Sequence, residues 1–158
     1  MIKGIIFDMD GTLIDTNQLI IKCIQDCVEK YLKYRPQENE LVAVHGKPLK
    51  TQMGFFSAKH TDDMVTYYRQ IYRENRDQMT TIYDGVVKML EDLKSKGIRM
   101  AIVSNKGANG VQHALSMFEI KEYFDICLSS SDVTKHKPDP EGIFKVLKFW
   151  DLLPNEIL

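Results

Sequence analysis

The sequence lacks any apolar run that approaches the roughly 18 residues of a membrane-spanning helix. We also expect no secretory signal, because Met1 is followed directly by KGIIFD, which is too short and too strand-like for one. Only three of the 158 residues are cysteines. An odd number of cysteines without a signal predicts the reducing cytoplasm as the location of this chain.

Soft metal ligands and an excess of charge are missing too. Cys23 and Cys27 are four residues apart in a helical pattern, and Cys127 stands alone. A zinc site would need further soft ligands at metal-binding spacing, so we expect buried thiols that behave as small apolar side chains. The net charge is −1, and no basic stripe is present, so we expect neither a nucleic-acid nor a membrane partner.

What the sequence does contain is an alternation of strand and helix patterns. Short apolar runs ending in small polar or acidic residues predict strands, and helical periodicity separates them. The expected strands are 2–7, 98–103 and 124–128, and the expected helices are 84–96, 108–117 and one that begins near Pro140. This order predicts an α/β fold with a doubly wound, Rossmann-like parallel sheet, in which the first strand is buried on both faces.

Finer signals define the ends and faces of two of these helices. Asp84 is the expected N-cap of the first helix, and Gly97 lies where a left-handed residue ends it. In the last helix we expect Ile143, Phe144 and Leu147 to face the core.

Residues 16–80 differ from the rest, because they show helical periodicity without a strand signal. We therefore expect two domains: a discontinuous Rossmann-like core made of 1–15 and 81–158, and an inserted all-α unit made of 16–80.

Acidic residues stand at the end of the first strand. Asp8 and Asp10 are two positions apart, so their side chains point in the same direction. In an open parallel sheet, ligands bind beyond the carboxyl ends of the strands. Two carboxylates there repel each other unless a cation joins them, and Mg²⁺ typically takes one or two carboxylates together with phosphate and water. The pair therefore indicates a magnesium site.

The other strands end in groups of complementary chemistry. Ser104 and Asn105 precede a helix and offer a hydroxyl, an amide and backbone N–H groups to an anion. Lys137 follows the third strand and adds a positive charge. A metal site, a phosphate cradle and a fixed cation at one crevice suit phosphoryl transfer.

The motifs that carry these groups resemble a known family. FDMDGTLIDT is similar to the first motif of the haloacid dehalogenase-like superfamily, DxDGT(L/V)xD. Ser104 in AIVSNK and Lys137 in KHKPDP resemble its second and third motifs. The insertion, with Gly46 and Pro48 in a G-x-P arrangement, resembles the helical cap of the phosphoglycolate-phosphatase-like branch.

The resemblance implies a role for each residue. Asp8 would be the nucleophile that forms an aspartyl phosphate, and Asp10 the general acid and base. Mg²⁺ would bind the Asp8 carboxylate and the Asp10 carbonyl. The phosphate would be held by Ser104, Asn105, Gly11 (through its N–H) and Thr12, and Lys137 would neutralise Asp8 and the substrate.

The sequence departs from the family pattern at its end. The family's fourth motif, whose acids complete the metal site, has no counterpart after LPNEIL. Asp132 and Asp139 are expected to be turn or helix-start residues rather than replacements. The sheet should therefore be incomplete, with its first strand an exposed edge unless another segment covers it. We expect loose metal binding and weak or absent turnover.

Several functions are compatible with these motifs. Phosphoglycolate, a small phosphorylated metabolite, is the substrate expected from the resemblance, and inorganic pyrophosphate is the alternative because DTNQLII resembles the start of the cap in pyrophosphatases of this branch. An inactive fragment or phosphate-binding module is the further alternative. Thr12 and Ile20 favour a phosphatase over a mutase. The oligomeric state is not indicated.

Overall fold

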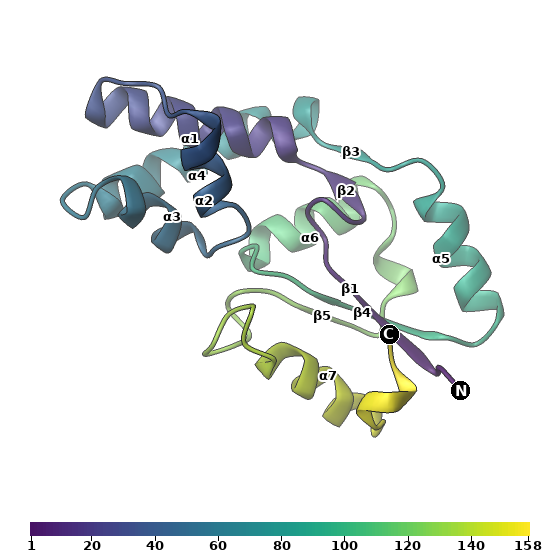
Figure 1. The fold of residues 1–158 in the computed structure, drawn as a ribbon. Coiled ribbons are helices and arrows are strands. Elements are labelled where there is room, and N and C mark those ends of the chain that lie inside the picture. Colours follow the sequence, from purple (N-terminus) through teal and green to yellow (C-terminus); the bar gives the residue numbers. More distant parts are fainter. The chain divides into compact units, whose positions relative to one another are not determined.

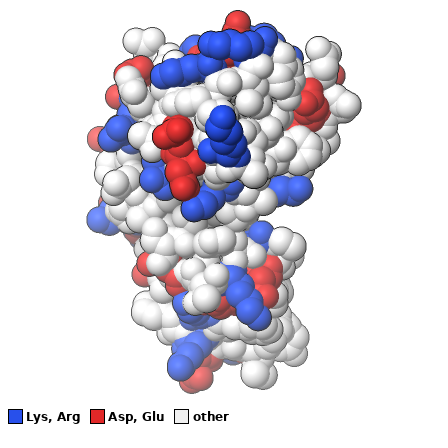
Figure 2. Space-filling view, turned by 90° about the vertical axis from the view of Figure 1, so that its left-hand side faces the viewer, with Lys and Arg blue, Asp and Glu red and all other residues white.

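The chain forms two compact units, shown as a ribbon in Figure 1 for the computed structural model, which describes residues 1–158. The first unit combines Met1–Asp15 with Ile82–Leu158, and the second is Thr16–Thr81. No helix in either unit is both long and apolar enough to cross a membrane. Figure 2 shows acidic and basic side chains interspersed on the visible face, as the near-zero net charge leads one to expect.

The first unit is built on a parallel sheet with the strand order β1-β4-β5. Its strands are β1 (Gly4–Phe7), β4 (Arg99–Val103) and β5 (Ile126–Leu128), and its helices are α5 (Val86–Ser95), α6 (Ala108–Met117) and α7 (Glu141–Trp150), with 3₁₀ turns η1 (Lys121–Tyr123) and η2 (Pro154–Glu156). The short strands β2 (Ile14–Asp15) and β3 (Thr81–Ile82) form a separate two-stranded sheet.

The central strand β4 carries the core of this unit on both faces. Met100 and Ile102 are buried in one cluster with residues of α5 and α6. Ala101 and Val103 are buried in a second cluster with Val146 and Trp150 of α7. Successive strand residues thus pack against helices on opposite sides of the sheet, which confirms the predicted doubly wound α/β architecture.

The strand β1 is less buried than expected. Gly4 is buried, but Ile5, Ile6 and Phe7 are only half-buried, so the strand enclosed on both faces is β4 rather than β1. The reason is the position of β1 beside the last residues of the chain, at the side of the sheet away from β5.

The open edge of β1 is partly covered by the end of the chain itself. Gly4 and Ile157 form a parallel bridge, and the Ile6 N–H donates to the Leu158 carbonyl at 2.8 Å. The Leu158 N–H in turn donates to the Gly4 carbonyl at 3.0 Å. Of the two alternatives left open by the sequence, a bare edge or one covered by another segment, the second holds for the first part of β1, because residues that follow η2 lie beside it.

Two details of the helices also differ from the sequence expectations. Gly85, with φ of 81°, is the N-cap of α5, and no side chain caps that helix, so Asp84 is not its N-cap. In α7 the buried face contains Gly142, Val146, Leu147 and Trp150, while Ile143 and Phe144 are exposed. Gly142 faces the sheet so closely that a Cβ there would lie 2.6 Å from Val103 Cγ1. Only a residue without a side chain therefore fits at this position.

The second unit is an all-α insertion with its own core. It contains α1 (Asn17–Leu32), α2 (Glu38–Val44), α3 (Leu49–Phe56) and α4 (Thr61–Met79). The buried stripe of α1 and that of α4, which includes Met64 and Tyr68, belong to the same hydrophobic cluster. The helical periodicity of these residues therefore correctly predicted an all-α insertion.

The three thiols are expected to be unreactive while the protein is folded. Cys23 and Cys27 are fully buried in α1, and Cys127 is half-buried in β5. Burial raises the pKa of Cys27 to about 12 and that of Cys127 to about 11. Because the thiolate is the reactive form, a disulfide reagent at mildly alkaline pH should label the native chain slowly.

In denaturant, the same reagent should label all three thiols within the mixing time of the experiment. Rapid labelling of native Cys27 or Cys127 at neutral pH would contradict the burial seen in the structure.

Candidate active site

The candidate site lies within the first unit, where its parallel strands end. Asp8 follows β1, Ser104 follows β4, and the segment that leads to Lys137 follows β5. Because the strands are parallel neighbours, their carboxyl ends lie along one edge of the sheet. The topology therefore brings Asp8 to Lys137, which lies more than a hundred positions further along the sequence.

Each of the two aspartates has its own lysine. The Lys137 Nζ lies 2.7 Å from Asp8 Oδ1, and the Lys106 Nζ lies 2.7 Å from Asp10 Oδ1. Asp8 Oδ1 also accepts the Met9 N–H at 2.8 Å. The two pairs together are neutral, so each lysine offsets the charge of one carboxylate at this edge of the sheet.

Lys106 was not singled out by the sequence reasoning. It directly follows Asn105 in the strand-to-helix turn, and its side chain is only 9% exposed although the residue is charged. The sequence did contain a signal that the Lys106 side chain could be enclosed. Gly110 lies four positions after Lys106, and a glycine at that spacing leaves room for a long side chain on the same face. Sequence alone did not indicate which carboxylate the lysine would meet.

Ser104 has the position that the sequence predicted, close to the end of β4. It is 4% exposed, and its Oγ accepts the Lys106 N–H at 3.1 Å. Its own N–H donates to the Leu128 carbonyl at 2.9 Å, which ties the turn to β5. The hydroxyl is thus held in a fixed place at the sheet edge, and its proton can still be donated to an anion.

Asn105 is engaged differently from the expectation. Its Oδ1 accepts the Lys137 N–H at 3.0 Å, and its Nδ2 donates to the Lys137 carbonyl at 3.1 Å. The side-chain amide therefore binds the backbone of Lys137 from both sides. In this structure the amide aligns the lysine that faces Asp8, and the phosphate-binding role expected for Asn105 stays a prediction.

The turn after Asp10 also differs in one detail. Gly11 adopts a φ of 78°, the left-handed conformation that favours glycine, but its N–H donates to the Ile14 carbonyl at 2.8 Å. That N–H is used by the turn in this structure, and the phosphate contact expected for it stays a prediction. Thr12 is exposed in the same turn, and its N–H donates to the Met9 carbonyl at 3.3 Å.

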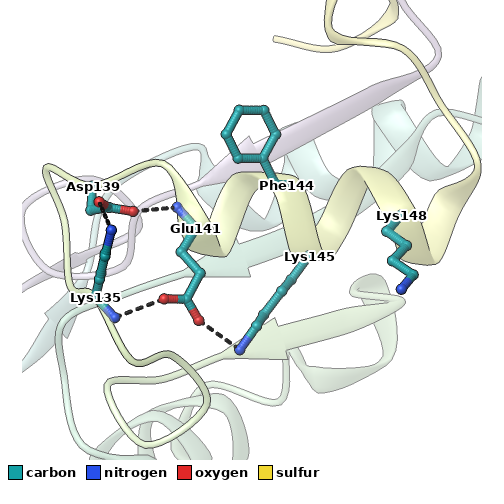
Figure 3. A pocket seen from close by; sticks show the side chains of 6 residues that line it. All are labelled: Lys135, Asp139, Glu141, Phe144, Lys145 and Lys148. Atoms are coloured by element: carbon teal, nitrogen blue, oxygen red, sulfur yellow. Dashed lines mark hydrogen bonds and ion pairs between the residues drawn. The ribbon is translucent and has the colours of Figure 1, made fainter.

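The segment that carries Lys137 is held by Glu141 at the start of α7. The carboxylate of Glu141 accepts the Thr134 and Lys135 N–H groups, the latter at 2.7 Å, and pairs with Lys145 at 2.8 Å (Figure 3). Figure 3 also shows Asp139 accepting the Glu141 N–H, at 3.0 Å. Asp139 is thus a helix-start residue, as the sequence predicted.

Asp132 is the second acid that the sequence assigned to a turn. Its carboxylate accepts both the N–H and the hydroxyl of Ser129, at 2.8 and 2.6 Å. These bonds hold the pKa of Asp132 below its usual range. The carboxylate is committed to its own turn, so the structure does not use it as a further acid beside Asp8.

The Glu141 contacts predict an acid-resistant carboxylate. The Lys145 hydrogen bond, followed by those from Thr134 and Lys135, lowers the pKa of Glu141 from 4.5 to about 2. A depressed folded-state pKa means that the contacts are intact above pH 4.5 and are lost as the pH falls toward 2. Carboxyl NMR should show Glu141 titrating near the bottom of that window.

Removing the ammonium provides the control. In Lys145→Met the Glu141 midpoint should move up toward the ordinary value, while Lys148→Met, one turn further along α7 and without a contact to Glu141, should leave it unchanged. A wild-type midpoint near 4.5 would show that Glu141 does not hold this segment in solution.

Comparison with known proteins agrees with the geometry. The family described as haloacid dehalogenase-like hydrolases matches residues 5–158. A candidate pyrophosphatase PpaX of Caldanaerobacter subterraneus subsp. tengcongensis is 37% identical over 147 residues, which are 93% of this chain and 67% of that protein. This chain belongs to the haloacid dehalogenase-like hydrolases.

Other members of these hydrolases extend the comparison. The pyrophosphatase PpaX of Bacillus mycoides is 31% identical, with 99% of this chain matching 73% of its length. A crystal structure described as a predicted phosphoglycolate phosphatase from Haemophilus somnus superposes with a TM-score of 0.84, 24% identity and coverage of 99% of this chain and 75% of that one. That level of identity shows a shared fold. The chain thus spans two thirds to three quarters of the length of these relatives.

Proposed function

We propose that this protein hydrolyses a small phosphorylated substrate with Mg²⁺, through an acyl phosphate (aspartyl phosphate) on Asp8. The observation that carries the proposal is the arrangement at the sheet edge: a nucleophilic carboxylate with a lysine at 2.7 Å, and a second carboxylate two residues away with a lysine of its own. A fixed serine hydroxyl lies at the end of the neighbouring strand. These are the parts that phosphoryl transfer needs, because its catalysis is mainly positioning and charge stabilisation.

The residues present can hold part of a magnesium site. The Asp8 carboxylate, whose side chain is 42% exposed, and the Asp10 carbonyl would supply hard oxygen ligands. No group of three His, Cys, Asp or Glu side chains is placed to hold a metal. Mg²⁺ commonly takes one or two carboxylates plus phosphate oxygens and water, so the donor set fits an ion that binds together with substrate. Bound by these oxygens, Mg²⁺ would supply positive charge that offsets the charge of the phosphoryl oxygens.

The reaction proposed for the chain's own residues has two steps. First, an Asp8 carboxylate oxygen bonds to phosphorus, the bond from phosphorus to the leaving oxygen breaks, and Asp10 gives that oxygen its proton. Second, a water attacks phosphorus as Asp10 takes back a proton, and the Asp8 carboxylate is released with inorganic phosphate. Lys137 neutralises Asp8 throughout, and Ser104 donates to a phosphoryl oxygen.

Inorganic pyrophosphate is the substrate that we favour over phosphoglycolate. The support comes from relatives at 31% and 37% identity that carry pyrophosphatase names, whereas the phosphoglycolate phosphatase is a likeness of fold. Pyrophosphate also presents only phosphate oxygens, which match a site made of lysines, a serine and carboxylates that would hold Mg²⁺.

The test is a comparison of substrates with one protein preparation. Phosphate release from pyrophosphate, phosphoglycolate and a sugar phosphate should depend on Mg²⁺, stop with a chelator, and show the highest kcat/KM for pyrophosphate. Because only two acids lie at the site, we expect slow turnover and loose metal binding. Higher kcat/KM for phosphoglycolate would reverse the substrate assignment, and binding of phosphate without any turnover would favour a phosphate-binding module.

A further inference from the structure

We infer that Lys106 is the positioning residue for Asp10: its ammonium fixes the place of the Asp10 carboxylate so that Asp10, and not Asp8, handles the proton. The inference rests on the proposed function for the separate roles of the two aspartates. The contact that carries it is the 2.7 Å distance from Lys106 Nζ to Asp10 Oδ1. With 9% of its side chain exposed, Lys106 is far more enclosed than Lys137, at 32%.

The backbone of Lys106 is fixed by two hydrogen bonds. Its N–H donates to Ser104 Oγ at 3.1 Å, and its carbonyl accepts the Ser130 N–H at 2.9 Å. Ser104 follows β4 and Ser130 follows β5, so hydrogen bonds to two strand ends fix the backbone from which the side chain starts. A side chain that begins at a fixed point loses less conformational entropy when its charged end is also fixed.

The methylene groups of the Lys106 side chain pack against Gly110. A Cβ at position 110 would lie 2.9 Å from Lys106 Cε, 3.1 Å from Cγ and 3.2 Å from Cδ. Gly110 is inside helix α6, where glycine costs roughly 0.5–1 kcal/mol relative to alanine. The open surface at this glycine is filled by the lysine stem, which gives a physical reason for a residue that otherwise weakens the helix.

Lys106 therefore pairs with Asp10, and Lys137 pairs with Asp8. Without Lys106, the Asp10 carboxylate would lose the ion-pair partner that defines its position. A misplaced acid and base slows proton transfer and leaves substrate binding intact. The expected signature is a fall in kcat with little change in KM, which differs from that of a lysine that binds the substrate itself.

The contact can be tested without any activity. Lysine ammonium protons give NMR signals when ion pairing and burial slow their exchange with water. The Lys106 signal should be present in the wild-type chain and in Asp8→Asn, and should be lost in Asp10→Asn. Gly110→Ala should also abolish it, because the new methyl group displaces the stem, while Gly107→Ala, where a Cβ meets no atom within 4 Å, should not.

Kinetics then test the consequence with pyrophosphate as substrate. Lys106→Met and Gly110→Ala should each lower kcat at least ~10-fold, with KM within ~3-fold, since general acid–base catalysis contributes about 10²–10⁴-fold. In an Asp10→Asn background, Lys106→Met should have no further effect. Lys106→Arg should restore part of the rate, and Lys88→Met on α5 should match the wild type.

The outcomes separate the two proposals. A Lys106 signal that survives both Asp10→Asn and Gly110→Ala overturns the inference, and so does an equal loss from Lys106→Met with and without Asp10. A large rise in KM with unchanged kcat would also overturn it, as it would make Lys106 a substrate-binding group. If the wild-type chain releases no phosphate, the proposed function fails, and the NMR comparison still decides whether Lys106 holds Asp10.

Discussion

Asp8→Asn is expected to lower phosphate release by at least ~10³-fold, because an amide cannot act as the carboxylate nucleophile. The covalent phosphate on the protein should disappear with the activity. Acid quenching during turnover, followed by detection of protein-bound phosphate that is lost in hydroxylamine, measures the intermediate directly. Phosphate release measured with the same samples gives the rate.

The fold should survive this substitution. Lys137, the partner of Asp8, keeps 32% of its side chain exposed, and a pair of that kind contributes about 0–1 kcal/mol. A matched control is Asp151→Asn: Asp151 ends α7 in the left-handed conformation, which asparagine also adopts readily. Retained activity and covalent labelling in Asp8→Asn, with the control unchanged, would remove Asp8 from the mechanism.

Trp150→Ala is expected to give the largest loss of stability. Trp150 is 3% exposed at the end of α7, and its ring occupies the space beside Gly4, where a Cβ would lie 2.6 Å from the ring carbon Cζ3. Its Nε1–H donates to Asp125 at 2.9 Å, and the Arg99 guanidinium donates to its carbonyl at 2.9 Å. Truncating a buried tryptophan typically costs about 3–5 kcal/mol.

This one residue joins α7 to all three strands of the sheet, and its ring also lies 5.4 Å from the Arg99 guanidinium. Gly4 belongs to β1, Arg99 to β4, and Asp125 immediately precedes β5, so the loss should be felt across the first unit. Thermal unfolding followed by circular dichroism should show the midpoint falling by about 6–20 °C, at roughly 2–4 °C per kcal/mol. Amide exchange of β4 would assign the effect to this unit rather than to the helical insertion.

Trp150→Phe separates packing from hydrogen bonding. Phenylalanine keeps an aromatic ring against Gly4 but has no N–H for Asp125, so we expect a cost of about 1–3 kcal/mol, mostly from the lost bond to a charged acceptor. If Trp150→Ala cost less than about 1 kcal/mol, the packing of α7 on the sheet would differ from this structure. Equal effects of the two substitutions would show that the hydrogen bond, and not the ring, provides the stability.

The sequence alone was sufficient for the elements that depend on local patterns. The strand expected at 98–103 is β4, Arg99–Val103, and the helix expected at 108–117 is α6 with the same bounds. Apolar periodicity determines such elements because it reports which residues can be buried together on one face. The motif FDMDGT, its partners in chain order and the family were likewise readable from the residues.

Only the tertiary structure decided which groups meet. Nothing near Lys106 in the sequence says that its ammonium reaches Asp10, and nothing near Asn105 says that its amide binds the backbone of Lys137. The outward direction of Phe144 was also beyond the pattern, since α7 offers apolar residues on more than one side and Gly142 selects the face that packs on β4.

The physical reason is the difference between local and long-range constraints. A helix or strand follows from hydrogen bonds and side-chain preferences within a few residues, which the sequence displays directly. An ion pair between positions 10 and 106 exists because parallel strands end at one edge of a sheet, and the covered half of β1 exists because Ile157 lies beside Gly4. Such contacts depend on strand order and register, which are properties of the folded chain as a whole.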